Sequence, residues 1–187
     1  MTYRELLNQI YEQKNELNAL LSSFWNQYSN FETWQFWVLL ATIILPLILL
    51  YFTVDRKRIF ELFFYGYTVH IFWTYIDIVL ERYNLFNHTY LLLPAFPFAV
   101  NITTSLLPVG FLLVYQYCTN HQKNFYLYTL ILSAIYSLLA ILENHIGFSE
   151  YNKGMNVFYI FLIDLGITYL SYWFTRTVKH YMQKTLD

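Results

Sequence analysis

One apolar stretch of this chain, residues 58–82, carries side chains that could bind a cation or exchange a proton. The stretch RIFELFFYGYTVHIFWTYIDIVLER is long enough to cross a bilayer, because about 20 apolar residues suffice. At about 100° per residue, four polar side chains share one narrow stripe of the predicted helix: His70, Thr74, Asp77 and Glu81. A lipid-facing helix gains nothing from such a stripe, so we expect it to face other parts of the protein.

Polar residues elsewhere are predicted to join this stripe. Asp77 lies about 10 Å further along the helix than His70, at 1.5 Å per residue. Asp164 occupies the middle of another apolar stretch, as His70 does, so we expect these two to pair. The predicted intramembrane cluster comprises His70, Thr74, Asp77, Glu81, Arg82, Asn101, Glu143 and Asp164.

This cluster has two interpretations. It could be an outward-facing site for a proton, a cation or a small solute. It could instead be a polar clamp, in which interhelical hydrogen bonds of roughly 0.6–2 kcal/mol each fix the helix register. A buried charge at a helix centre costs about 2.5–3.5 kcal/mol, so pairing or hydration is expected in either case.

The sequence contains no motif for known soluble-enzyme chemistry, so we predict no catalytic residues and no cofactor. The motifs GxSxG and HExxH and a phosphate-binding glycine loop are missing. His70, His88 and His145 lack metal-ligand spacing, and Cys118 is the only cysteine, so we predict no metal site. The net charge of −1 gives no electrostatic basis for binding nucleic acid.

The composition is that of an integral membrane protein. Hydrophobic residues make up 57% of the chain and charged residues only 12%, about half the charged share of soluble domains. The predicted fold is all-α, with five transmembrane helices in contact with the lipid bilayer. Their predicted spans are 34–54, 59–80, 98–118, 125–146 and 155–175. Residues 83–97 are predicted to form a loop that folds back onto the outer face of the bundle, and residues 147–154 a short loop.

An amphipathic helix is predicted before the first span, over residues 3–28. Apolar residues recur there in alternating steps of three and four, interrupted only by Lys14. This helix could recruit a partner, or it could lie on the membrane or on its own bundle. The predicted organisation is therefore an amphipathic segment (1–31), a membrane domain (32–178) and a short tail (179–187).

The distribution of basic residues predicts the orientation. With five spans, one side holds seven Lys and Arg residues and the other holds four. The richer side should be cytoplasmic, which places the N-terminus outside and the C-terminus inside. The cytoplasmic side includes a tight basic turn between the first two spans, Arg56, Lys57 and Arg58, where Lys57 and Glu61 are spaced to pair.

Several local patterns resemble a family of small five-helix integral membrane proteins from spore-forming Firmicutes, which is uncharacterised. The resemblance covers about residues 45–175. It rests on the turn at 55–58, the run HIFWTYID at 70–77, the proline loop at 92–97, the run SLLPV at 105–109 with the Tyr-Gln pair at 115–116, and Glu143. The resemblance implies the fold and a bacterial cell-membrane location, but no reaction.

Two classes of function follow from these observations. The first is a non-enzymatic interaction or accessory subunit, with a protein partner or a second copy of the chain. The second is an oligomeric channel or transporter for protons, cations or a small solute. The two classes differ in whether a water-accessible cavity reaches Asp77 and Glu143: a dry, tightly paired cluster favours the first class, whereas a wet funnel that reaches His70 favours the second.

Overall fold

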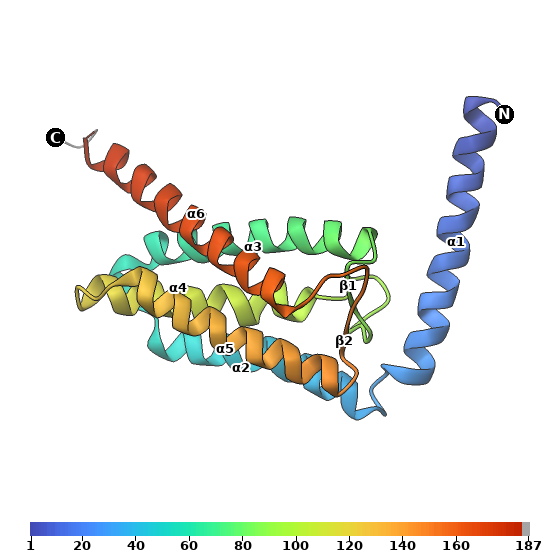
Figure 1. Ribbon diagram of the computed structural model, residues 1–187, viewed down its shortest axis with the longest axis horizontal. Coiled ribbons are helices and arrows are strands. Elements are labelled where there is room, and N and C mark those ends of the chain that lie inside the picture. The colour runs from blue at the N-terminus through green and yellow to red at the C-terminus, as the bar shows by residue number, and fades with distance from the viewer. Residues whose placement is uncertain (185–187) are drawn as a thin grey trace.

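The computed structural model describes residues 1–184 and confirms that the chain is all-α (Figure 1). The described residues form six α-helices: α1 (Tyr3–Tyr28), α2 (Trp34–Thr53), α3 (Ile59–Arg82), α4 (Leu107–Asn120), α5 (Phe125–His145) and α6 (Val157–Lys184). Short elements are the turn η1 (Arg56–Arg58), the π-helix η2 (Ile102–Leu106) and two strands, β1 (Phe86–His88) and β2 (Ser149–Tyr151). Residues 185–187 of the predicted tail lie outside the described residues.

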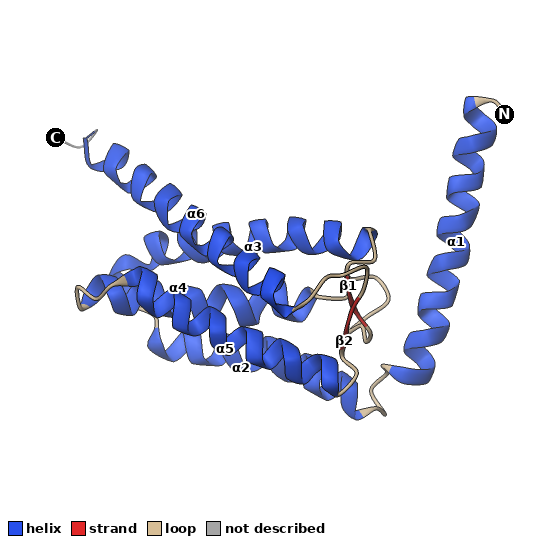
Figure 2. Ribbon diagram, in the orientation of Figure 1, coloured by secondary structure: helices blue, strands red, loops and turns tan. Residues whose placement is uncertain are grey.

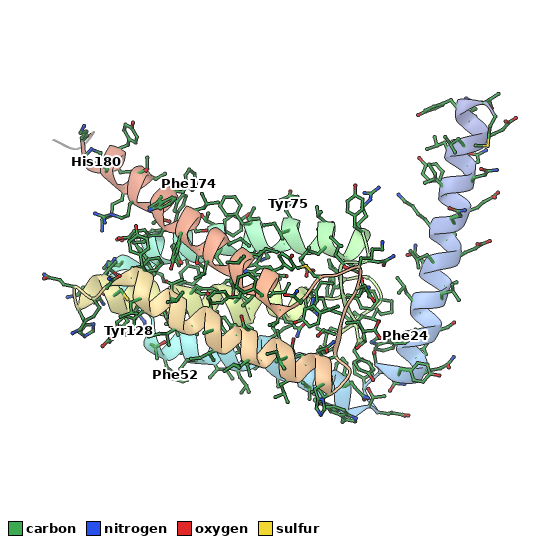
Figure 3. The ribbon with its side chains drawn as sticks, viewed as in Figure 1. Phe24, Phe52, Tyr75, Tyr128, Phe174 and His180 are labelled. Atoms are coloured by element: carbon green, nitrogen blue, oxygen red, sulfur yellow. The ribbon has the colours of Figure 1, made fainter. Side chains whose placement is uncertain are left out.

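Four of the described helices are long and apolar enough to cross a membrane: Trp34–Thr53, Ile102–Asn120, Phe125–His145 and Val157–Met182. Much of their apolar surface points outward. Phe52 is 78% exposed and Leu138 is 66% exposed, and Figure 3 shows Phe52 and Phe174 projecting from the bundle. Water does not favour an apolar surface of this extent, so the four helices are candidate membrane spans in contact with lipid.

Helix α3 was also predicted as a span, but it is not one of these four. It is helical from Ile59 to Arg82, and its tyrosines, His70 and Asp77 reduce its apolar character. Helix α3 packs against α4 and α6 within the bundle. Leu62, Tyr65 and Val69 are completely buried there.

Close packing around α3 depends on aromatic rings and one glycine. The Tyr65 and Tyr115 rings stack with their centroids 4.5 Å apart. A methyl group on Gly66 would lie 2.8 Å from Leu112 Cδ1, so α3 and α4 approach closely because this residue has no side chain. Helix α6 turns its small polar residues toward the bundle interior: Asp164, Thr168, Ser171 and Thr175 are all buried.

The third predicted span begins differently from a regular helix. Residues Ile102–Leu106 form a π-turn, in which the Leu107 N–H donates to the carbonyl of Ile102, and Pro108 follows at the start of α4. Two polar residues at this turn bind α2: the Asn101 amide donates to Thr42 Oγ1 at 2.8 Å, and Ser105 Oγ donates to the Ile43 carbonyl at 2.7 Å. The irregular turn is therefore held by interhelical hydrogen bonds.

The loops predicted at 83–97 and 147–154 pair with each other, which the sequence did not predict. Strands β1 and β2 are antiparallel, with Phe86 opposite Tyr151 and His88 opposite Ser149 (Figure 2). Each strand has three residues and they are about 60 positions apart, so neither shows a strand pattern of its own. Strand β1 packs against α3 and β2 against α5, and Leu91 and Leu92 in the loop after β1 are buried.

Helix α1 lies apart from the bundle and runs across the direction of the other helices (Figure 1). None of its described residues is buried. A capping box between Thr2 and Glu5 closes its first turn. Only its C-terminal end contacts the bundle, where Trp25 Nε1 donates to the Leu92 carbonyl at 2.8 Å and the rings of Phe24 and Tyr90 lie 6.5 Å apart.

The basic turn differs from its prediction in one pairing. Glu61 binds Arg58 Nη2 at 2.7 Å and Lys179 Nζ at 2.9 Å, instead of Lys57. The guanidinium of Arg58 also donates to the side chains of Thr119 and Asn120. The turn therefore connects α3 to the ends of α4 and α6.

Candidate functional site

Four ionisable residues from different parts of the chain line one small cavity near β1. Its lining includes Asp77 of α3, His88 of β1, Glu143 of α5 and Asp164 of α6. The volume of this cavity is about 50 Å³. A cavity of this size accommodates one or two water molecules but no organic solute.

Asp77 and His88 form a buried pair. His88 Nε2 lies 3.3 Å from Asp77 Oδ1, and the two side chains are only 7% and 4% exposed. Burial lowers the pKa of His88, but the hydrogen bond to Asp77 and the negative charges of Asp77, Glu143 and Glu81 raise it more, so the pKa lies above its ordinary value. A protonated His88 can donate this hydrogen bond and neutralise Asp77.

Glu143 and Asn101 continue the polar lining on the α2 side. Glu143 borders both the main cavity and a second chamber of about 20 Å³, which Asn101 and His88 also line. Asn101 is buried and bound to Thr42, as described above. Glu143 and His88 therefore line the same two spaces, each large enough for water.

Asp164 has a different partner from the one predicted. Trp73 Nε1 donates to Asp164 Oδ1 at 2.9 Å, and the Asp164 residue is 1% exposed. The expected contact between α6 and α3 is present, but Trp73 makes it and His70 does not. Trp73 lies one position before Thr74, so its side chain points to the face of α3 that meets α6.

His70 and Thr74 lie on another side of α3. His70 Nδ1 is 2.8 Å from the Thr103 carbonyl, which can only accept, so Nδ1 carries the proton. Thr74 Oγ1 is 3.3 Å from the same nitrogen. The structure thus divides the predicted stripe: His70 binds the π-turn with Thr74 beside it, and Asp77 binds β1.

Glu81 and Arg82 end the stripe at the surface. Glu81 is half-buried near Asp77 and His88, and Arg82 is exposed. Of the eight residues predicted to cluster, Asp77, Glu143 and Asp164 share the main cavity, with Asn101 in the adjoining chamber.

His88 is the central residue that sequence analysis missed. The available signal was the prediction that residues 83–97 fold back onto the outer face, which would have placed this histidine near Asp77. Helical periodicity could not reveal it, because the residue belongs to a short strand.

The arrangement offers paired hydrogen bonds and no open reaction centre. Among the described residues, no group of three His, Cys, Asp or Glu side chains is placed to hold a metal ion. Of the three acids that line the cavity, Asp77 binds His88 and Asp164 binds Trp73, so these two contacts join α3 to β1 and to α6. In the comparisons with known proteins, no family model, curated protein or solved structure matches this chain.

Proposed function

We propose that this chain is a non-enzymatic interaction or accessory subunit of the bacterial cell membrane. The observation that carries the proposal is α1, a 26-residue helix with no buried residue, which extends beyond the outer end of the bundle. The small volume of the cavity supports the same class of function. A volume of about 50 Å³ has room for water but not for an organic solute. We also propose that the chain belongs to the five-helix family that its sequence resembles.

The membrane domain is proposed to cross the bilayer five times, with α3 as the additional span. Helices α2 and α4 run in the same direction in Figure 1, so the chain between them must return across the membrane. Helix α3 is the segment that makes this return. The excess of basic residues at the end that carries η1 supports a cytoplasmic location for that end and an external location for α1.

The apolar stripe of α1 is the proposed recognition surface. Its members follow heptad spacing throughout: Tyr3, Leu7, Ile10, Lys14, Leu17, Leu21, Phe24 and Tyr28. Lys14 is the one charge in the stripe, so two parallel copies would bring like charges together. A partner helix with an acid opposite Lys14 fits better, and a neighbouring membrane protein beside the bundle lies within reach of α1.

Lipid is a less favourable occupant for this stripe. Interfacial helices carry many Lys and Arg residues on their polar face. Helix α1 carries Glu5, Glu12 and Glu16 against Arg4 and Lys14, so anionic headgroups repel it. The proposed partner is therefore a protein.

A photo-crosslinking residue at Leu17, in the stripe, tests this function in intact cells. We expect one discrete protein adduct, and we expect Lys14→Glu to reduce it at least severalfold. The matched control places the crosslinker at Glu12, on the opposite face of the helix, where no adduct is expected. A second measurement uses the purified protein in vesicles with a fluorescent label at position 17. Strong quenching by bilayer-attached quenchers would contradict the proposal, because the stripe would then lie in lipid.

A further inference from the structure

A groove with a basic rim lies at the other end of the bundle, where α6 diverges from α3. The last turns of α6 leave the bundle in Figure 1. The space between them and the start of α3 is a groove of about 510 Å³. Its floor is apolar, formed by Phe60, Phe64, Val178 and Met182.

Positive charge is concentrated on the rim. Lys57, Arg58 and Lys179 line the groove together with the carboxylate of Glu61. Glu61 binds both Arg58 and Lys179, so the described lining retains an excess of two positive charges. The surrounding segments add to this excess, because residues 55–61, 119–123 and 172–184 contain seven basic and two acidic residues.

The apolar floor continues outward from this rim. Phe60 is 89% exposed, and Met182 is 63% exposed. Phe64 lines the groove, and its ring packs against that of Phe174 with the centroids 5.5 Å apart. A ligand that fits must therefore carry a negative headgroup next to a long apolar chain.

We infer that this groove binds one anionic glycerophospholipid from the membrane leaflet at the end of the bundle that carries η1. Its phosphate lies between Lys57, Arg58 and Lys179, and an acyl chain covers Phe60, Phe64 and Val178. A phosphodiester carries one negative charge, which the excess charge of the rim can neutralise. Basic pockets between helices at the cytoplasmic surface recognise anionic lipid headgroups in this way. A second cavity of about 470 Å³ lies next to the groove and shares Lys179 with it. Lys123 and Arg176 line this cavity too, and it leaves room for the rest of the headgroup.

Native mass spectrometry of the purified full chain in an uncharged detergent tests the inference with two probes, phosphatidylglycerol and phosphatidylcholine. We expect one phosphatidylglycerol to bind more tightly than phosphatidylcholine. The variant Lys57→Gln/Lys179→Gln should weaken that binding by roughly fivefold for each lysine removed. Both lysines are exposed, so the variant should fold. The matched control, Arg4→Gln/Lys153→Gln, removes two basic residues at the opposite end and should leave binding unchanged.

A second variant distinguishes the lipid from a free anion. Val178→Trp fills the apolar floor and keeps every charge, and we expect it to abolish preferential phosphatidylglycerol binding. Millimolar inorganic phosphate should not displace the bound lipid. Equal binding of the two lipids, unchanged binding by either groove variant, or full displacement by phosphate would overturn the inference. None of these results would bear on the α1 crosslinks, so the two proposals fail independently.

Discussion

Replacement of His88 with alanine is expected to lower the free energy of unfolding by about 3–5 kcal/mol, because it leaves the carboxylate of Asp77 buried without its partner. The measurement is a denaturant titration of the purified protein in mixed micelles. Asp77 is only 3% exposed, so its carboxylate would keep at most the one or two waters that the small cavity holds in place of the imidazole.

Two controls separate this effect from a general effect of histidine removal. His145→Ala changes an exposed histidine nearby and should alter stability by less than about 0.5 kcal/mol. The double variant Asp77→Asn/His88→Ala removes both charges and should recover part of the loss. Equal destabilisation by His88→Ala and His145→Ala would show that the buried pair makes no contribution.

The same pair makes stability depend on pH. The pKa of His88 is raised in the folded protein, as described above, so the protonated form stabilises the fold. This stabilisation is fully present below the unfolded pKa of about 6.5 and is lost as pH rises through the higher folded value. The free energy of unfolding of the unaltered protein should therefore decline as the pH rises above 6.5. The His88→Ala variant should not show this decline.

The second large effect is expected at Trp73. Trp73→Phe keeps most of the ring but removes the N–H that binds Asp164, which should cost about 1–3 kcal/mol. The matched control is Trp173→Phe. Trp173 also donates one hydrogen bond, to the Tyr126 hydroxyl, but it is 52% exposed, so its loss should cost less.

Asp164 provides the reciprocal test of this contact. Asp164→Leu should destabilise the protein more than Thr168→Ala does, because the Thr168 hydroxyl binds only backbone carbonyls of its own helix. In a double-mutant cycle, Trp73→Phe and Asp164→Leu should be coupled by at least about 0.5 kcal/mol. Additive losses would mean that the hydrogen bond does not link α3 to α6.

The helices could be predicted from the sequence because each carries its own local signal. Long apolar runs end at charged turns, and the observed ends of α2 and α5 differ from the predicted spans by one residue. The apolar residues of α1 recur in alternating steps of three and four, and this pattern predicted its bounds, Tyr3–Tyr28, in the same way. These signals need no knowledge of neighbouring helices.

The site could be predicted only in part. Periodicity correctly placed polar residues on inward-facing positions such as Asp77 and Asp164. It could not choose between neighbouring partners, since His70 and Trp73 are only three positions apart yet serve different helices. It also could not bring His88 to Asp77, because that contact depends on two three-residue strands meeting across a long separation.

The central claim is that the chain crosses the membrane five times and presents α1 outside. Single cysteines at Glu12 in α1 and at Lys184 at the end of α6, each in a Cys118→Ser background, test it most directly. An impermeant thiol reagent is applied to intact cells, and permeabilised cells serve as the control for reactivity. The five-span account predicts labelling at position 12 in intact cells, and labelling at position 184 only after permeabilisation. Labelling at both positions in intact cells, at neither, or at position 184 alone would contradict it.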